Sequence, residues 1–373
     1  MLFLNASVHI INLLELKKMK ATYNVDWVEC YCIEQDFFGT PDYYRNLGYI
    51  VKEHDYGTRM YKQVFDVFAP NNRPLYHITR DPYSVRGREK GGIFPIGACH
   101  IKVQNNLLYN DDWCVELLAF LMDNHYEFKC ISRIDLCCDL QQFADGTLPK
   151  TLVAGYFAGK YHKVNQPNFT AHGVDNEYGL KIYNSVSWGS KNSSVSSIIY
   201  NKSKELKEVK DKPYIRDQWT QAGFNPKKTT WRIELKIKSD GRRLLNKESG
   251  EIQELRLTDF DTKTKVKAQF LKYAQHYFRW KNAKNGVKKK NCNDKKLFDD
   301  LPLDNWAPYR SLGEDGAKRS DRIAVGYLQT FRERAVSFSG EEQEVLNKAI
   351  SIILQHKRLV KWFREKYTGY YIE

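Results

Sequence analysis

Two segments with the same residue pattern constrain the fold of this chain most. "SRIDLCCDL" begins at residue 132 and "WRIELKIK" at residue 231, and polar and apolar residues alternate in both. Such alternation is typical of a β-strand buried on one side. We expect apolar faces made of Ile134, Leu136 and Cys138 in the first strand and Trp231, Ile233, Leu235 and Ile237 in the second. The opposite faces would carry Arg133, Asp135, Cys137 and Asp139, and Arg232, Glu234 and Lys236.

Further strands and helices are expected around these two. "NVDWVECYCI", "GYIVKEHDYGTRMYKQVFDVF" and "SSVSSIIYNK" are rich in strand formers, and Tyr56-Gly57 marks a turn in the second. "DDWCVELLAFLMDNH" has helical spacing, with Val115, Leu118, Phe120 and Leu121 on one face. Strands interleaved with helices predict an α+β fold, with a mostly antiparallel sheet and helices on one face.

The chain changes character after Leu245. "TKTKVKAQFLKYAQHYFRW" is amphipathic, with Val266, Phe270, Tyr273 and Tyr277 at helical spacing, and Ser339 to Glu342 forms a capping box before another amphipathic run. We expect residues 1–20 to be a loosely attached leader, with an ordinary N-terminal helix as the alternative. Residues 21–248 would form an α+β domain, and residues 249–373 a mainly helical region that binds DNA or a partner.

The charge balance favours a polyanionic partner. The 373 residues include 59 Lys and Arg against 45 Asp and Glu, a net charge of +14. Nucleic acid is the commonest such partner, although a merely soluble basic protein is the alternative. The eight cysteines show no zinc-ligand spacing, so we expect reduced thiols and a cytoplasmic location. No apolar run reaches about 18 residues, which argues against a membrane span.

Acidic residues on the two signature strands predict a metal site. If the strands are neighbours, Asp135 and Glu234 would lie about 5 Å apart as a cross-strand pair. Carboxylates this close suit Mg²⁺ or Mn²⁺, which would also hold a phosphate. Salt bridges of Arg133 with Glu234 and of Arg232 with Asp135 explain the pattern equally well. Asp139 is a weaker ligand candidate, because it lies about 13 Å from Asp135 along a straight strand.

Tyr200 is a candidate nucleophile. In "SSIIYNK", strand alternation places Tyr200 and Lys202 on one face. A lysine beside a tyrosine stabilises phenolate character, or the charge that builds on an attacked phosphate. A structural tyrosine is the commoner interpretation of such a residue.

The residues "SRIDLCCD", "WGSKNSSVSSIIYNKSKEL" and "WRIELKIK", in this order and spacing, resemble the replication initiation factor family. This family comprises rolling-circle replication initiators of plasmids and phages, and related relaxases of conjugative elements. The resemblance covers about residues 22 to 245 and rests on Arg133-Ile134-Asp135, Gly189-Ser190-Lys191-Asn192-Ser193, Ile199-Tyr200-Asn201-Lys202 and Arg232-Ile233-Glu234. Many relatives have a second tyrosine where Ser187 and Trp188 stand here, while Tyr183 remains nearby as a spare candidate.

The resemblance implies an enzyme that nicks one DNA strand at an origin. Tyr200 would be the nucleophile, with Lys202 beside it, and would stay attached to the 5′ phosphate while a free 3′-OH is left for a polymerase. Asp135 and Glu234, with Asp139 as the weaker candidate, would hold Mg²⁺ or Mn²⁺. The DNA-binding candidates are Arg133, Lys191, Arg232 and the basic loop Lys288-Lys289-Lys290, with Trp188 stacking on bases or packing in the core.

The implied partners are locally single-stranded origin DNA, a host helicase and a polymerase, with a homodimer left open. Three alternatives also remain open. A conjugative relaxase would use the same site, a metal-dependent nuclease would use water in place of Tyr200, and a DNA-binding regulator would catalyse nothing.

Overall fold

The computed structural model describes residues 19–35, 40–83, 94–179, 181–190, 193–209, 211–246, 248–299, 306–308, 339–341 and 344. The chain divides into two compact units, Met1–Pro308 and Tyr309–Glu373. Almost all of the expected leader, Glu342 of the capping box and Lys191 fall outside the described residues. The description below therefore concerns the first unit.

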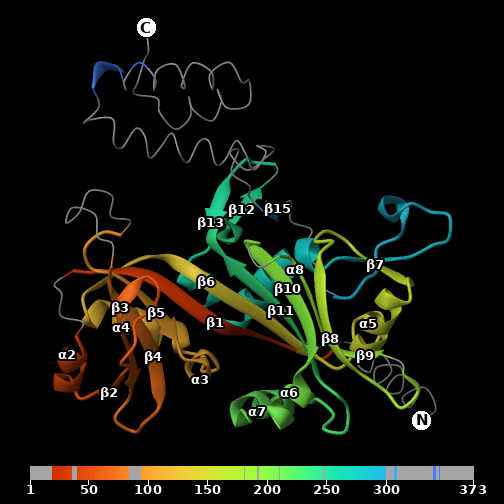
Figure 1. Cartoon of the computed structure of the whole chain (residues 1–373). Helices are drawn as coiled ribbons and strands as arrows, with labels where there is room; N and C mark the ends of the chain where they lie inside the picture. Colours follow the sequence, from red (N-terminus) through yellow and green to blue (C-terminus); the bar gives the residue numbers. More distant parts are fainter. Residues whose placement is uncertain are drawn as a thin grey trace, which may run out of the picture. The chain divides into compact units, whose positions relative to one another are not determined.

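The first unit is built on one large antiparallel sheet (Figure 1). Its ten described strands run in the order β2-β3-β4-β5-β1-β6-β11-β10-β9-β8. Their bounds are β1 Ala21–Glu34, β2 Ile50–Glu53, β3 Tyr61–Phe68, β4 Pro74–Pro82, β5 Ala98–Val103, β6 Tyr126–Leu140, β8 Phe169–Asp175, β9 Lys181–Trp188, β10 Val195–Asn201 and β11 Trp231–Lys238. The two signature strands, β6 and β11, are hydrogen-bonded neighbours at the middle of this sheet.

The sheet has one apolar face and one polar face, as the alternation predicts. Ile134, Leu136 and Cys138 of β6, together with Ile233 and Leu235 of β11, belong to the hydrophobic core. We call the opposite side, which carries Arg133, Asp135, Asp139, Arg232 and Glu234, the polar face. Directly paired residues of antiparallel strands point to the same side of a sheet. The register of any strand therefore tells which of its residues share the polar face.

The described helices are α2 Pro41–Asn46, α3 Asn105–Leu108, α4 Trp113–Asp123, α5 Pro149–Phe157, α6 Lys202–Glu208, α7 Pro213–Gln221 and α8 Lys263–Tyr277. Short 3₁₀ segments follow at Ser239–Arg242, Leu257–Phe260 and Lys289–Asn291. Two small sheets complete the unit: β13 (Ile252–Glu254), β12 (Arg243–Asn246) and β15 (Trp306–Pro308) form one, and β14 (Trp280–Asn282) with β7 (Tyr161–Lys163) forms the other. The α+β class is confirmed.

Helix α8 packs against β1, β6, β10 and β11 and closes the core over the middle of the sheet. The Thr262 side chain accepts a hydrogen bond from the Lys265 backbone N–H, a cap worth about 1 kcal/mol. Val266, Phe270 and Tyr273 are buried as their spacing predicts. Because β1, β6, β10 and β11 meet this helix on one side, their polar side chains are left to the other.

Helix α4 exists where the spacing places it, but one residue of its expected apolar face is wrong. Val115 is 62% exposed, whereas the buried residues are Trp113, Cys114, Leu117, Phe120 and Leu121. These five form an i, i+1, i+4, i+7, i+8 stripe, which a helix buries more completely than the expected set.

Two further findings relate to the expected cytoplasmic location. Within the described part of the chain, no helix combines the length and apolar character needed to cross a bilayer. All eight cysteines carry free thiols, and all but Cys130 are buried. The cytoplasmic location itself stays a prediction.

Candidate functional site

Asp135 and Glu234 share the polar face but do not form a direct cross-strand pair. Asp135 lies opposite Lys236, and Glu234 lies opposite Cys137. The two carboxylates are therefore diagonal neighbours, about 7–8 Å apart at the backbone, and the expected separation of about 5 Å is wrong. Register depends on how the whole strands meet, which residue patterns in the two segments do not specify.

Tyr200 lies on the polar face beside Glu234. In β10 it pairs directly with Arg232 of β11. Its hydroxyl donates a hydrogen bond to Glu234 Oε2 at 3.3 Å, and Lys202 Nζ donates to Tyr200 Oη at 3.4 Å. Tyr200 and Lys202 are neighbours, as the sequence predicts. They were expected to share one face of a strand, however, whereas Lys202 is the first residue of α6.

The lysine is buried and ion-paired. Lys202 Nζ lies 2.6 Å from Glu205 Oε2, one helical turn along α6, and its side chain is 1% exposed. Asn201 caps this helix by accepting a hydrogen bond from the Lys204 N–H. The strand-to-helix transition at Asn201 therefore fixes the ammonium group beside the phenol.

Burial raises the pKa values of both Glu234 and Tyr200. Burial, with added repulsion from Asp135 and Asp26, raises the pKa of Glu234 to about 8. Burial and the Glu234 charge raise the pKa of Tyr200 well above its usual value, although Arg232 acts in the opposite direction. The resting tyrosine is a neutral phenol facing a carboxyl group that titrates near neutral pH. Titratable pairs of this kind are typical of functional sites.

Asp135 is held by the arginine of its own strand. Arg133 Nε and Nη2 donate to the two Asp135 carboxylate oxygens at 2.9 and 2.5 Å. Burial raises the pKa of Asp135, and the Arg133 hydrogen bonds oppose that shift. The alternative salt-bridge pattern is wrong in its pairing, because Arg133 contacts Asp135 and not Glu234.

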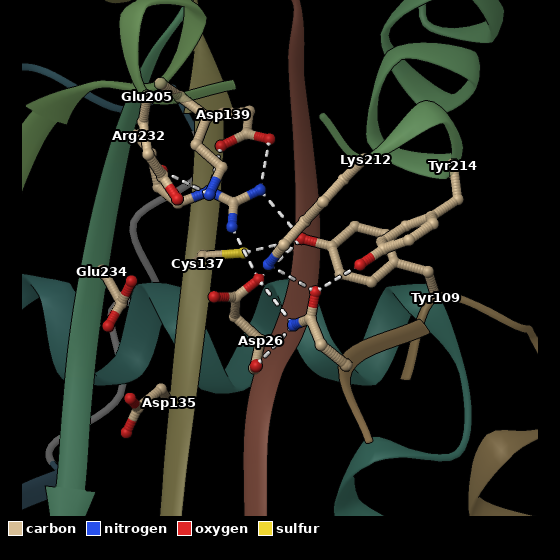
Figure 2. Close-up of polar contacts among 12 residues, drawn as sticks. Asp26, Tyr109, Asp135, Cys137, Asp139, Glu205, Lys212, Tyr214, Arg232 and Glu234 are labelled. Atoms are coloured by element: carbon tan, nitrogen blue, oxygen red, sulfur yellow. Dashed lines mark hydrogen bonds and ion pairs between the residues drawn. The ribbon is translucent and has the colours of Figure 1, made fainter. Parts of the chain in front are cut away.

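Arg232 is the centre of a buried network (Figure 2). Its Nε and Nη2 donate to Asp139 at 2.6 and 2.8 Å, and its Nη1 donates to Asp26 Oδ1 at 2.6 Å. Nη2 also donates to Tyr109 Oη at 2.8 Å. The expected pairing of Arg232 with Asp135 is therefore wrong.

Asp26 is a site residue that the sequence patterns missed. Burial alone would raise the pKa of Asp26, but the charges of Arg232, Lys202 and Lys212 hold it well below its usual value. Asp26 sits at a β-bulge, where the β1 register shifts between Val25 and Trp27. Val25 and Val28 are both core residues, so the alternation breaks between them, and that break was the available signal.

Asp139 has little capacity left for an ion. Both of its oxygens accept from Arg232, and Oδ2 also accepts from Trp219 Nε1 at 2.8 Å. The side chain is fully buried. Its role as a ligand stays a prediction, but these contacts favour Asp139 as the orienting partner of Arg232.

Two of the expected DNA-binding residues are inaccessible. Trp188 is fully buried among Tyr156, Phe278 and Trp280, so it cannot stack on a base and the core interpretation holds. Arg232 is also fully buried, with its donors directed to Asp26, Asp139 and Tyr109. These two assignments are corrected: one residue fills the core, and the other neutralises carboxylates.

The remaining DNA-binding candidates differ in position. The basic loop Lys288-Lys289-Lys290 is exposed, and a 3₁₀ turn begins within it. Arg133 is partly exposed on the polar face, with 23% of its side chain accessible. Tyr183, the spare nucleophile candidate, stacks on Phe157 with ring centroids 3.8 Å apart.

The carboxylates near Tyr200 fit a hard cation that takes its remaining ligands from water or a substrate phosphate. Burial, and then repulsion from Asp135 and Asp26, raises the pKa of Glu234, and a bound cation would relieve the repulsion. Mg²⁺ is commonly held by one or two carboxylates plus substrate phosphate and water. Among the described residues, the one group of three ligand atoms within 4.8 Å of one another is His54, Asp66 and His77, which lies elsewhere on the sheet.

Comparison with known proteins gives only a distant structural likeness. No protein-family model matches the chain, and no curated protein matches it either. The chain is similar to a solved structure of a rolling circle replication initiator protein from Geobacillus stearothermophilus, with a TM-score of 0.42 and 14% sequence identity. The match covers 74% of this chain and 93% of that one. A likeness of this extent carries no argument about function.

Proposed function

We propose that this protein is a rolling-circle DNA replication initiator that nicks one strand at an origin through Tyr200. The observation that carries the proposal is the position of the Tyr200 hydroxyl, 3.3 Å from a Glu234 oxygen and 3.4 Å from Lys202 Nζ. A proton acceptor and a cation on either side of a phenol are what a tyrosine nucleophile needs. Two of the three family-like segments contribute these residues: "WGSKNSSVSSIIYNKSKEL" holds Tyr200 and Lys202, and "WRIELKIK" holds Glu234.

The proposed chemistry is phosphoryl transfer to Tyr200. The phenol oxygen attacks the scissile phosphorus as its proton passes to Glu234. The new bond joins Tyr200 Oη to phosphorus, the P–O3′ bond breaks, and the 3′ oxygen leaves as a hydroxyl after taking up a proton. Lys202 offsets negative charge on the transferring phosphoryl group. The product ester conserves the bond energy, so the reverse reaction rejoins the strand.

Asp135 and Glu234 would hold Mg²⁺ or Mn²⁺ at this site. The ion would polarise the non-bridging oxygens of the scissile phosphate. For Asp135 to become a ligand, its two hydrogen bonds to Arg133 must be shared or exchanged. The partly exposed Arg133 would then be released to contact a DNA phosphate, in keeping with its expected role.

The wider expectations belong to the same proposal. The exposed loop Lys288-Lys289-Lys290 would bind the DNA backbone, and Lys191 would also contact DNA. Residues 21–248 would catalyse, and residues 249–373 would bind DNA or a partner such as a host helicase or a second copy. A polymerase would extend the free 3′-OH, and the activity would take place in the cytoplasm.

A covalent adduct is the decisive test. Full-length protein is incubated with Mn²⁺ and single-stranded oligonucleotides that tile its own replicon, and products are separated on a denaturing gel. Tyr200→Phe should lose the adduct, while Tyr183→Phe, a matched change on the neighbouring strand β9, should keep it. Both variants retain the ring and remove one hydroxyl.

The other outcomes identify the rivals. An adduct that survives in Tyr200→Phe and disappears in Tyr183→Phe would move the nucleophile. Cleavage without an adduct would favour a nuclease that uses water, and binding without cleavage of origin-containing DNA would favour a regulator. Adduct formation on an origin of transfer, in place of a replication origin, would favour a relaxase.

A further inference from the structure

A second group of potential ligands lies on the polar face, away from Tyr200. His54 follows strand β2, Asp66 lies in β3 and His77 lies in β4. Asp66 pairs directly with His77, and the His54 backbone N–H donates to the Val64 carbonyl at 3.0 Å. The backbone of all three residues is therefore held by hydrogen bonds of the sheet and its first turn, and not by a long loop.

The three side chains converge. His54 Nε2 lies 2.9 Å from Asp66 Oδ2, and His77 Nδ1 lies 2.7 Å from Asp66 Oδ1. One ligand atom from each residue lies within 4.8 Å of the other two. Tetrahedral coordination with metal–nitrogen bonds of about 2.0–2.1 Å needs ligand atoms about 3.4 Å apart. The two carboxylate–imidazole separations, 2.9 and 2.7 Å, are shorter than that value, so the side chains would have to move apart slightly to take up an ion.

We propose that His54, Asp66 and His77 form a binding site for a transition-metal ion of the Zn²⁺ class. Two imidazole nitrogens and one carboxylate oxygen suit Zn²⁺ or Co²⁺ better than Mg²⁺, which prefers oxygen ligands. The three side chains are 16%, 19% and 30% exposed, so an ion can enter and water can complete the coordination. Gln104 Nε2, 3.5 Å from Asp66 Oδ1, helps to orient the carboxylate.

This site is separate from the oxygen ligands beside Tyr200. The sheet order places two strands, β5 and β1, between β4 and β6, and β11 follows β6. Four strand spacings, about 19 Å, thus separate the strand of His77 from that of Glu234. The two sites also differ in ligand chemistry, so different ions would fill them.

A lysine of the neighbouring strand β5 is held against an aromatic ring. Lys102 of β5 pairs directly with His77 and so shares the polar face. Its Nζ lies 3.5 Å from the centroid of the Trp27 ring, on the side of β1, and Arg133 stacks on the same ring. Held there, the ammonium group attracts Asp66 through its charge, while the hydrogen-bond partners of the Asp66 carboxylate are His54, His77 and Gln104.

A bound ion would link the end of the edge strand β2 to strands β3 and β4. β2 is the edge strand and pairs only with β3 among the described strands, and His54 is the residue after its end. Linking His54 to β3 and β4 through a metal would stabilise this edge in the folded state only. Ligand binding of that kind raises the unfolding temperature by mass action.

The test uses chelator-treated full-length protein and Zn²⁺ or Co²⁺ alone. Calorimetric titration should show one Zn²⁺ per chain, and Co²⁺ should give visible absorption bands of a nitrogen- and oxygen-ligated ion. His54→Gln and His77→Gln should each weaken binding by at least about 10-fold, since losing a direct ligand should cost no less than the 10–100-fold of an outer-shell partner. His172→Gln, an exposed histidine of β8, should bind normally. Zn²⁺ in hundredfold excess over its Kd should raise the wild-type Tm by on the order of 5 °C.

Glutamine keeps a hydrogen-bond donor toward Asp66, so these variants test ligation with little loss of the local contact. The Co²⁺ spectrum of the wild type reports the ligands without any substitution. The proposal is overturned if the wild type shows no saturable Zn²⁺ binding, or if a double variant with both His54→Gln and His77→Gln binds Zn²⁺ as well as the wild type. Loss of binding in Asp135→Asn, with both histidines intact, would equally place the ion elsewhere.

Discussion

Glu234→Gln should make the protein more stable at neutral pH while abolishing adduct formation. Glutamine keeps an oxygen that accepts the Tyr200 hydroxyl hydrogen bond, but it carries no charge at any pH. In the wild type, folding shifts the pKa of Glu234 from 4.5 to about 8. The folded state therefore favours the protonated carboxyl, so this group's contribution to stability is present at low pH and lost as pH rises from about 4.5 to about 8.

The pKa shift of Glu234 limits how much more stable the variant can be than the wild type. From pH 4.5 to about pH 7.5, roughly three pH units at about 1.4 kcal/mol each give an upper limit near 4 kcal/mol. The Glu234 side chain keeps partial exposure, which screens its repulsion from Asp135 and Asp26. We expect the variant to be about 2 kcal/mol more stable near pH 7.5 and within about 0.5 kcal/mol of the wild type near pH 5.

The assay is urea unfolding of both proteins at the two pH values, with chelator present. Glu53→Gln, on the exposed edge strand β2, serves as the control and should change stability little at either pH. Adding Mg²⁺ should stabilise the wild type and so reduce the difference in unfolding free energy between the variant and the wild type. Equal stability near pH 7.5, or a difference that does not depend on pH, would refute the electrostatic reasoning.

Two further predictions test the surroundings of the site. Arg232→Met removes the arginine that pairs with the buried Asp139 and the partly exposed Asp26, and should cost about 3–5 kcal/mol in urea unfolding. Arg279→Met breaks an exposed pair with Asp294 and should cost less than about 1 kcal/mol, so equal costs would contradict the network. Changing Lys288 to Lys290 together to alanine should reduce the salt dependence of single-strand DNA binding by about two units of log–log slope, measured by fluorescence anisotropy, and an unchanged slope would place the contacts elsewhere.

The sequence predicts the faces of the sheet better than its register. A period of two follows from backbone geometry alone, so Asp135 and Glu234 were placed on the correct side of β6 and β11. Which residues lie opposite each other depends on bulges and connections throughout the sheet. β1 shifts register three times against β6, and no local pattern specifies those shifts. The diagonal placement of the two carboxylates could therefore not be derived from the two segments.

Sites assembled from distant segments were the hardest to anticipate. Asp26 reaches Arg232 across 206 positions of sequence, and its signal was only a break in strand alternation. His54 and His77 have no metal-binding spacing along the chain. They meet because the β2–β3 turn returns His54 to Asp66, and β3 pairs with β4. Trp188, by contrast, could be assigned from its own side chain. Its large apolar surface favoured the core over an exposed stacking position.

If Tyr200 is the nucleophile that we propose, its contacts explain how it stays inert before DNA binds. Burial and the Glu234 charge raise its pKa, so the phenol keeps its proton. Lys202 stands beside the oxygen, but its charge is largely compensated by Glu205 at 2.6 Å. In the proposed reaction, attack therefore needs the Tyr200 proton to pass to Glu234 as negative charge develops on the phosphate near Lys202, and both would occur only with substrate bound. Holding a carboxylate beside the phenol costs stability in the empty site, which is why the same substitution of Glu234 should raise stability and remove activity.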